Sequence, residues 1–81
     1  MPKIAVIILN YNGQQYLKEL FNSLNKTAYP IQDWQIFFID NASADQSLIW
    51  SKNNQPACRF IANQKNLGFA EGNNVGLKAA L

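Results

Sequence analysis

Three turns rich in glycine and amide side chains hold the residues best suited to bind a polar ligand. Asn10-Tyr11-Asn12 follows the first apolar stretch, Asp40-Asn41 closes the second, and the sequence NLGFAEGNNVG at residues 66–76 comes after the third. The carboxylate of Asp40 could accept a charge-assisted hydrogen bond from N3–H of uracil or thymine, and the ring of Tyr11 could stack on such a base. Free backbone amides near Gly68 could face a diphosphate or a sugar hydroxyl. The chemistry that these groups could perform is the binding of a polar ligand.

Each of these residues also fits a purely structural role. An aspartate in the sequence Asp40-Asn41-Ala42-Ser43 can form a turn or cap a helix without any ligand. Tyr11 can pack half-buried on the following helix, while Asn12 caps that helix and Gln15 closes a capping box. Asp45 suits the first turn of a helix, where the helix dipole favours an acidic side chain. These alternatives stay open on the sequence alone.

Three strands and three helices are predicted in alternation. Residues 4–9, 35–40 and 58–62 form short apolar runs typical of strands buried on both faces. Helices are predicted over about residues 13–25 and 44–52, and from residue 68 or 69 through 81. Tyr29-Pro30 should end the first helix, and Ser43 with Gln46 should cap the second. Gly68 suits a left-handed turn, and Gly72 with Gly76 would let the third helix approach a sheet closely.

This alternation predicts an α/β fold, a three-layer parallel Rossmann-like sheet joined by right-handed crossovers. All strands of such a sheet end at one edge, so the three polar turns should meet where open α/β sheets bind ligands. The dinucleotide and P-loop fingerprints are absent. A phosphoacceptor role for Asp40 would need an acidic pair after the first strand, where the sequence has Asn10 and Asn12.

The composition excludes several classes of protein. A chain of 81 residues is one domain at most, and a net charge of +2 with 15% charged residues gives no basic stripe for nucleic acid. Polarity comes instead from eleven Asn and seven Gln. Without histidine, any chemistry must use carboxylates. Cys58 has no partner for a disulfide, the start lacks a signal peptide, and the run 4–9 is too short to span a membrane. We expect a cytoplasmic protein in which Trp34 and Trp50 serve as packing residues.

The polar turns together resemble one known family. The segments Val6–Gly13, Asp40–Asp45 and Asn66–Gly76 are similar to the N-terminal, nucleotide-binding half of family 2 glycosyltransferases, which have the GT-A fold. The likeness covers essentially the whole chain and points to the branch that includes rhamnosyltransferases and O-antigen transferases. The resemblance implies a nucleotide-sugar site formed by Asn10, Tyr11, Asn12, Asp40, Asn41, Gly68, Phe69 and Asn74, with Asp45 and Asn73 as further candidates.

The resemblance also implies what the rest of such an enzyme supplies. Residues 1–81 would be a partial nucleotide-sugar-binding domain that stops before the Asp-x-Asp-like metal motif, with no catalytic residue and no metal ligand of its own. The full-length enzyme would use Mg²⁺ or Mn²⁺, a UDP- or dTDP-linked donor and a glycan or lipid-linked acceptor. It would invert the anomeric carbon and act in surface polysaccharide synthesis, at the inner face of the membrane or in the cytoplasm. Many relatives carry arginine where this chain has Asn73, which leaves the donor open.

A second function class remains: a noncatalytic truncated α/β module that acts by self-association or partner binding. In the fold that the resemblance implies, the first strand is flanked by the second and by one that this chain lacks. Residues 4–9 would then form an uncharged sheet edge, which invites pairing with another chain. We therefore expect a homodimer through this strand, which Lys in place of Val6 or Ile8 should disrupt.

Overall fold

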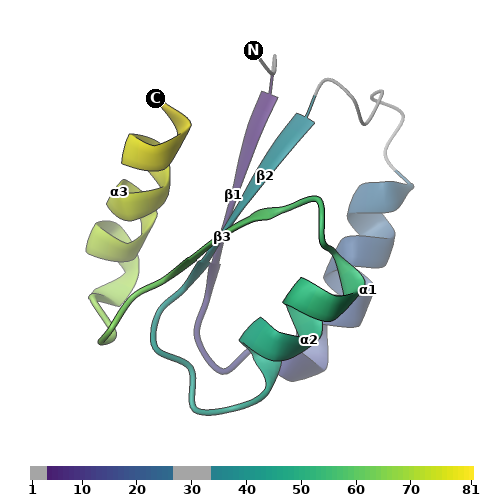
Figure 1. Ribbon diagram of the computed structural model, residues 1–81, viewed down its shortest axis with the longest axis horizontal. Coiled ribbons are helices and arrows are strands. Elements are labelled where there is room, and N and C mark those ends of the chain that lie inside the picture. Colours follow the sequence, from purple (N-terminus) through teal and green to yellow (C-terminus); the bar gives the residue numbers. More distant parts are fainter. Residues whose placement is uncertain (1–3, 27–33) are drawn as a thin grey trace.

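The computed structural model describes residues 4–26 and 34–81, and it contains the six predicted elements in the predicted order (Figure 1). The strands are β1 (Ile4–Asn10), β2 (Trp34–Asp40) and β3 (Arg59–Ala62). The helices are α1 (Gln14–Asn25), α2 (Ser47–Asn54) and α3 (Gly68–Ala80). The break predicted at Tyr29-Pro30 lies outside the described residues.

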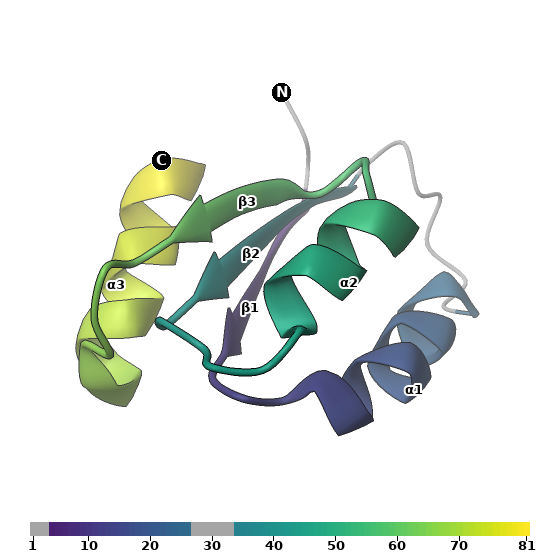
Figure 2. The same ribbon diagram turned by 60° about the horizontal axis from the view of Figure 1, so that its bottom comes forward.

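The three strands form one parallel sheet in the order β1-β2-β3. Asn10 pairs with Asp40, and Asp40 with Ala62, so the three strands end side by side. The three arrowheads in Figure 2 lie at this common edge, and the loops that leave them lead to α1, α2 and α3. The predicted parallel sheet is confirmed, with β1 at one edge of it.

The helices α1 and α2 cover one face of the sheet and enclose the main core, whereas α3 covers the opposite face (Figures 1 and 2). Ile8 of β1 packs with Leu17 and Phe21 of α1 and with Phe38 of β2. The rings of Phe21 and Phe38 stack with centroids 6.3 Å apart. Burying such rings is the main favourable term in folding, and here it fixes the two helices whose starts lie beside the polar turns.

The helix α3 lies close against the sheet because glycines face it. A Cβ at Gly72 would lie 2.6 Å from Leu9 Cδ1, and a Cβ at Gly76 would lie 2.6 Å from Ile7 Cγ2. Both distances are far inside van der Waals contact, so a larger residue at either position would require the Leu9 or Ile7 side chain to move. The predicted close approach is confirmed.

Two predicted capping boxes are wrong. The N-cap residues are Gly13 in α1 and Gln46 in α2, and neither caps its helix with a hydrogen bond from its own side chain. The helix α2 also begins at Ser47 and not near Ala44, because the preceding residues are held in a turn by side chains from the β1–α1 loop, as described below. Within the described residues, no helix has the length and apolar character needed to cross a bilayer.

Candidate functional site

A hollow of about 280 Å³ lies at the carboxyl edge of the sheet. We call it the donor hollow, after the nucleotide-sugar site that the resemblance found in the sequence implies there. It is lined by Leu9, Tyr11, Asn41, Asn66, Gly68 and Phe69, which come from the end of β1, the three loops that follow the strands and the start of α3. Four of these six residues were predicted from the sequence: Tyr11, Asn41, Gly68 and Phe69. The arrangement confirms that these residues meet at one place, although they are far apart in the chain.

The aromatic rings at the donor hollow are open to solvent. Tyr11 is 54% exposed and Phe69 is 81% exposed, so neither ring is needed to fill the core. The half-buried packing role considered for Tyr11 stays open, because about half of the residue is covered and it lines a hollow together with Leu17 and Leu20 of α1. An exposed aromatic pair beside a polar floor offers flat apolar faces to a planar ligand.

Asn41 forms the floor of the donor hollow and holds the loop between β3 and α3. Its side chain is 2% exposed. Its Nδ2 donates to Asn66 Oδ1 at 3.0 Å and to the Gly68 carbonyl at 3.2 Å, while its Oδ1 accepts from Asn63 Nδ2 at 3.0 Å and from the Leu67 amide at 3.1 Å. All four bonds go to one loop, so Asn41 fixes the position of Gly68 and hence of Phe69.

Gly68 has the backbone conformation predicted for it. Its φ is +80°, in the left-handed region that favours glycine, and its amide donates to Asn66 Oδ1 at 2.8 Å. A Cβ at this position would meet nothing within 4 Å. The backbone at Gly68 is thus open toward the donor hollow, and the turn at this position brings α3 onto the sheet.

Asp40 and Asn10 lie beneath the loops in a buried hydrogen-bonded cluster. Asp40 is 3% exposed and Asn10 is 4% exposed. Asp40 Oδ1 accepts from Asn10 Nδ2 at 2.9 Å and from Ser43 Oγ at 2.7 Å, and its Oδ2 accepts from the Ser43 amide at 3.0 Å. Asn10 Nδ2 also lies 2.8 Å from Ser47 Oγ. These are the contacts expected if Asp40 stabilises the turn that follows β2. Sequence reasoning missed Ser47, since nothing in its spacing sets it apart from an ordinary helical serine.

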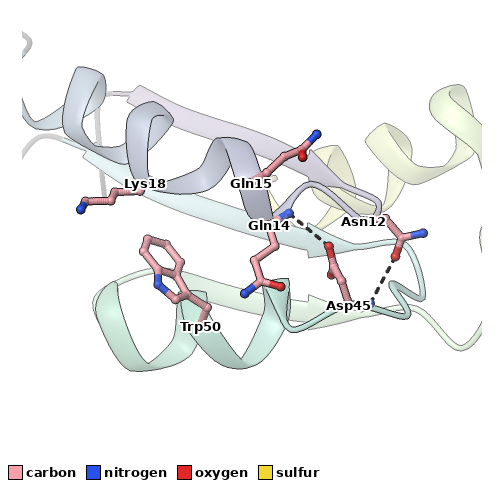
Figure 3. Close-up of a pocket in the computed structure, with 6 residues that line it drawn as sticks. All are labelled: Asn12, Gln14, Gln15, Lys18, Asp45 and Trp50. Atoms are coloured by element: carbon pink, nitrogen blue, oxygen red, sulfur yellow. Dashed lines mark hydrogen bonds between the residues drawn. The ribbon is translucent and has the colours of Figure 1, made fainter.

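The β1–α1 and β2–α2 loops exchange hydrogen bonds, because side chains near each loop accept from backbone amides of the other (Figure 3). Asn12 Oδ1 accepts from the Ala44 amide at 2.7 Å, whereas Asp45 Oδ2 accepts from the Gln14 amide at 3.1 Å. Gln14 Oε1 in turn accepts from the Gln46 amide at 3.1 Å. Asn12 therefore serves the turn before α2 and not the start of α1, and Asp45 caps α1 from the other loop. This exchange is the reason why both predicted capping boxes fail.

The carboxyl of Asp45 is ionised at neutral pH. Partial desolvation pushes its pKa up, but hydrogen bonds from the Ser47 hydroxyl and from the amides of Ser47 and Gln14 outweigh that effect. The pKa of Asp45 is therefore lowered from its usual value of 3.8. The stabilisation that these bonds give is complete above that usual value and is lost as the pH falls through the lowered one.

The two remaining predicted residues lie away from the donor hollow. Asn74 is exposed on α3 and lines a separate hollow of about 250 Å³ with Leu67, Glu71, Val75 and Lys78. The side chain of Asn73 donates to the Phe69 carbonyl within α3, at 3.0 Å. The structure therefore does not bring these two side chains together with Tyr11 and Gly68.

A resident metal has no site among the residues that the structure describes. No group of three or more Asp, Glu or Cys side chains in residues 4–26 and 34–81 could hold an ion. The described residues thus do not fit a metal, and we assign no step to one.

Comparison with known proteins identifies the family. The family described as Glycosyl transferase family 2 matches residues 5–81. The poly(ribitol-phosphate) beta-N-acetylglucosaminyltransferase TarS of Staphylococcus aureus (strain Mu50) is 40% identical over 48 residues, which are 59% of this chain and 8% of TarS. An uncharacterized glycosyltransferase of Haemophilus influenzae is 30% identical over 79 residues, which are 94% of this chain and 24% of that protein. The chain thus spans less than a quarter of each relative.

Two solved structures match the fold. The crystal structure of S. aureus TarS residues 1–349 in complex with UDP-GlcNAc gives a TM-score of 0.84 at 32% identity, over 98% of this chain and 24% of that one. The mannosyltransferase PcManGT from Pyrobaculum calidifontis, in complex with GDP-Man and Mn²⁺, gives 0.82 at 21% identity, over 99% of this chain and 25% of that one. The second likeness shows the fold alone. The predicted GT-A architecture is confirmed.

Proposed function

This chain belongs to glycosyl transferase family 2, and on that basis we propose that it forms the donor-binding part of an inverting glycosyltransferase. The observation that carries the proposal is the donor hollow, where Tyr11, Asn41, Gly68 and Phe69 meet at the carboxyl edge of the sheet. Ligands of open α/β sheets bind at this edge. The donor would be a UDP- or dTDP-linked sugar, and UDP-GlcNAc in the matching TarS structure supports the uridine form.

Each residue at the donor hollow has a proposed role. The rings of Tyr11 and Phe69 flank the nucleobase, and the open backbone at Gly68 faces the diphosphate or the sugar. Asn41 positions the Gly68 loop and has no free bonding group for the donor, because both its polar atoms are already paired. Asp40 Oδ2 accepts a single hydrogen bond, so it retains a lone pair for base contact if the β2–α2 loop opens. We assign no catalytic residue within residues 1–81.

The reaction that fits this donor site is transfer of the sugar to a hydroxyl acceptor, a glycan or a lipid-linked saccharide, in surface polysaccharide synthesis at the cytoplasmic side of a membrane. The acceptor base lies outside the residues described. For the full-length enzyme we propose dependence on Mg²⁺ or Mn²⁺, a proposal supported by the Mn²⁺ in the PcManGT structure. Residues 1–81 alone would bind the donor weakly and transfer nothing.

Truncating Phe69 tests the donor hollow directly. Removing this ring should weaken UDP and thymidine diphosphate binding by about two- to tenfold, since an aromatic stacking contact contributes on the order of 0.5–1.5 kcal/mol. Phe69→Ala can be compared by calorimetry with Leu77→Ala, an equally conservative truncation at an exposed position of the same helix. Unchanged affinity in Phe69→Ala, or an equal loss in both variants, would remove Phe69 from the site.

A second candidate function rests on the free edge of β1. Among the described residues β1 pairs with β2 alone. A module that acts by self-association would require such an unpaired strand edge. Failure of both nucleotides to bind, together with a stable dimer, would favour this noncatalytic function over the first.

A further inference from the structure

A second hollow, between α1 and α2, contains polar groups with bonding capacity that the hydrogen bonds described above leave unused. Its volume is about 420 Å³, within the range of about 300–1,000 Å³ found for small-molecule sites. It is lined by Asn12, Gln14, Gln15, Lys18, Asp45 and Trp50 (Figure 3). We call it the interhelix hollow. It shares no lining residue with the donor hollow.

Trp50 gives this hollow a flat apolar surface. The indole is half-buried and packs on Phe21, with ring centroids 6.4 Å apart. Figure 3 shows the ring standing in the gap between the helices, with Gln14 on one side and Lys18 on the other. Within the part of the chain that the structure describes, its indole N–H has no hydrogen-bond acceptor. Such a surface, apolar on its face with a free donor at its edge, suits stacking of a ring that also carries hydroxyls.

The polar groups around Trp50 are held in place and partly unused. Gln14 Oε1 accepts a hydrogen bond from the backbone amide of Gln46, which holds the Gln14 side chain in place. No described residue accepts a hydrogen bond from Gln14 Nε2. Asp45 is fixed by the Gln14 and Ser47 amides and keeps further acceptor capacity. Lys18 has no ion pair or hydrogen bond among the described residues. The hollow therefore offers both donors and acceptors, and hydrogen bonds hold two of these groups, Gln14 and Asp45, in place.

The charges select the class of ligand. The lining contains one cation, Lys18, and one carboxylate, Asp45, whose lowered pKa keeps it ionised near neutral pH. An anion would meet the carboxylate and a cation would meet the ammonium, so neither is favoured. A neutral ring with several hydroxyls can use the aromatic face, the donors and the acceptors together.

We propose that the interhelix hollow binds a neutral sugar ring, stacked on Trp50 and hydrogen-bonded to Gln14 Nε2, Lys18 Nζ and Asp45. Asn12 lines this hollow and the preceding residue, Tyr11, lines the donor hollow, so a single turn separates the two. That placement favours one sugar unit of the glycan acceptor as the occupant. This last assignment rests on the proposed function, whereas saccharide binding itself does not.

The test is a titration of the isotopically labelled 81-residue chain with maltotriose, cellotriose and chitotriose, followed by NMR. At least one of these should shift the indole N–H signal of Trp50 and the side-chain amide of Gln14, and leave the indole signal of Trp34 in place. The spectrum of Trp34→Phe assigns the two indole signals. Titration with UDP in the same sample reports on Gly68 and Phe69, so failure here is distinguishable from failure of the proposed function.

Two matched variants sharpen this test. Gln14→Glu keeps the oxygen that accepts from Gln46 but removes the free donor, and it should weaken saccharide binding by about two- to tenfold, as loss of one hydrogen bond does. Gln64→Glu makes the same change in charge at an exposed position that does not line the interhelix hollow, and it should bind as the native chain does. Both positions are exposed, so both variants should fold.

Four outcomes would overturn the proposal. The first is no shift with any of the three saccharides at millimolar concentration, and the second is a set of shifts centred on Tyr11 and Phe69 instead. The third is an equal effect of Gln14→Glu and Gln64→Glu, and the fourth is tighter binding of inorganic phosphate or uridine than of every saccharide.

Discussion

At the scale of single residues, Asp40 is the one buried carboxylate of the described residues, and its three hydrogen bonds tie the end of β2 to the end of β1 and to the start of the next loop. The residue type of Asp40 and its position at the strand end predicted that Asp40 and its neighbours would lie at the ligand-binding edge of the sheet. The partners could not be predicted, because Asn10 and Asn12 bond to groups about thirty residues away in sequence. An asparagine after a strand has the same local signature whether it caps the next helix or reaches another loop.

Asp40→Asn should destabilise the fold even without a ligand. The new amide group would face either Asn10 Nδ2 and Ser43 Oγ or the Ser43 amide, so a donor would oppose a donor in a buried place. The free energy of unfolding, measured in urea, should fall by about 1–3 kcal/mol. An unchanged value would contradict the buried cluster. Pyrimidine affinity of the folded fraction should also fall if Asp40 contacts the base, and unchanged affinity would leave Asp40 with the turn role alone.

At the scale of elements, the packing of α3 on the sheet fixes the distance between the Gly68 loop and Tyr11. The spacing of Gly72 and Gly76 predicted this close approach correctly, since two glycines four residues apart share one helix face. The starts of α1 and α2 were predicted wrongly for a physical reason. Each start is bonded by a side chain from the other loop, and local capping patterns carry no information on such contacts.

Gly72→Ala should destabilise the protein and disturb the donor hollow together. The added methyl would lie 2.6 Å from Leu9 Cδ1 and 3.0 Å from Asn41 Nδ2, and both residues line that hollow. Overpacking of this kind costs about 1–3 kcal/mol. Thermal unfolding and UDP affinity should both decline, whereas Asn74→Ala, at an exposed position of the same helix, should leave thermal stability unchanged or slightly raised. Equal stability of the two variants would show that α3 can move away from the sheet at no cost.

At the scale of the whole molecule, β1 remains an edge strand, and the homodimer expected from the sequence stays a prediction. The substitutions first suggested for testing it are unsuitable, because Val6 and Ile8 pack into the core with α1. Ala5 is the exposed residue of β1, so Ala5→Lys should lower the dimer fraction seen by sedimentation and leave the far-UV circular dichroism unchanged. A native chain that stays monomeric at all concentrations would refute the dimer.

The central claim concerns nucleotide binding at the carboxyl edge of the sheet, and chemical-shift mapping with UDP and thymidine diphosphate tests it most directly. We predict that at least one of the two nucleotides, at millimolar concentration, shifts the amides of Tyr11, Gly68 and Phe69 together. Tyr11 lies on the β1–α1 loop, whereas Gly68 and Phe69 lie at the start of α3, so they meet only in the folded protein. Shifts confined to other surfaces, or no shifts with either nucleotide, would contradict the assignment of this edge as the donor site.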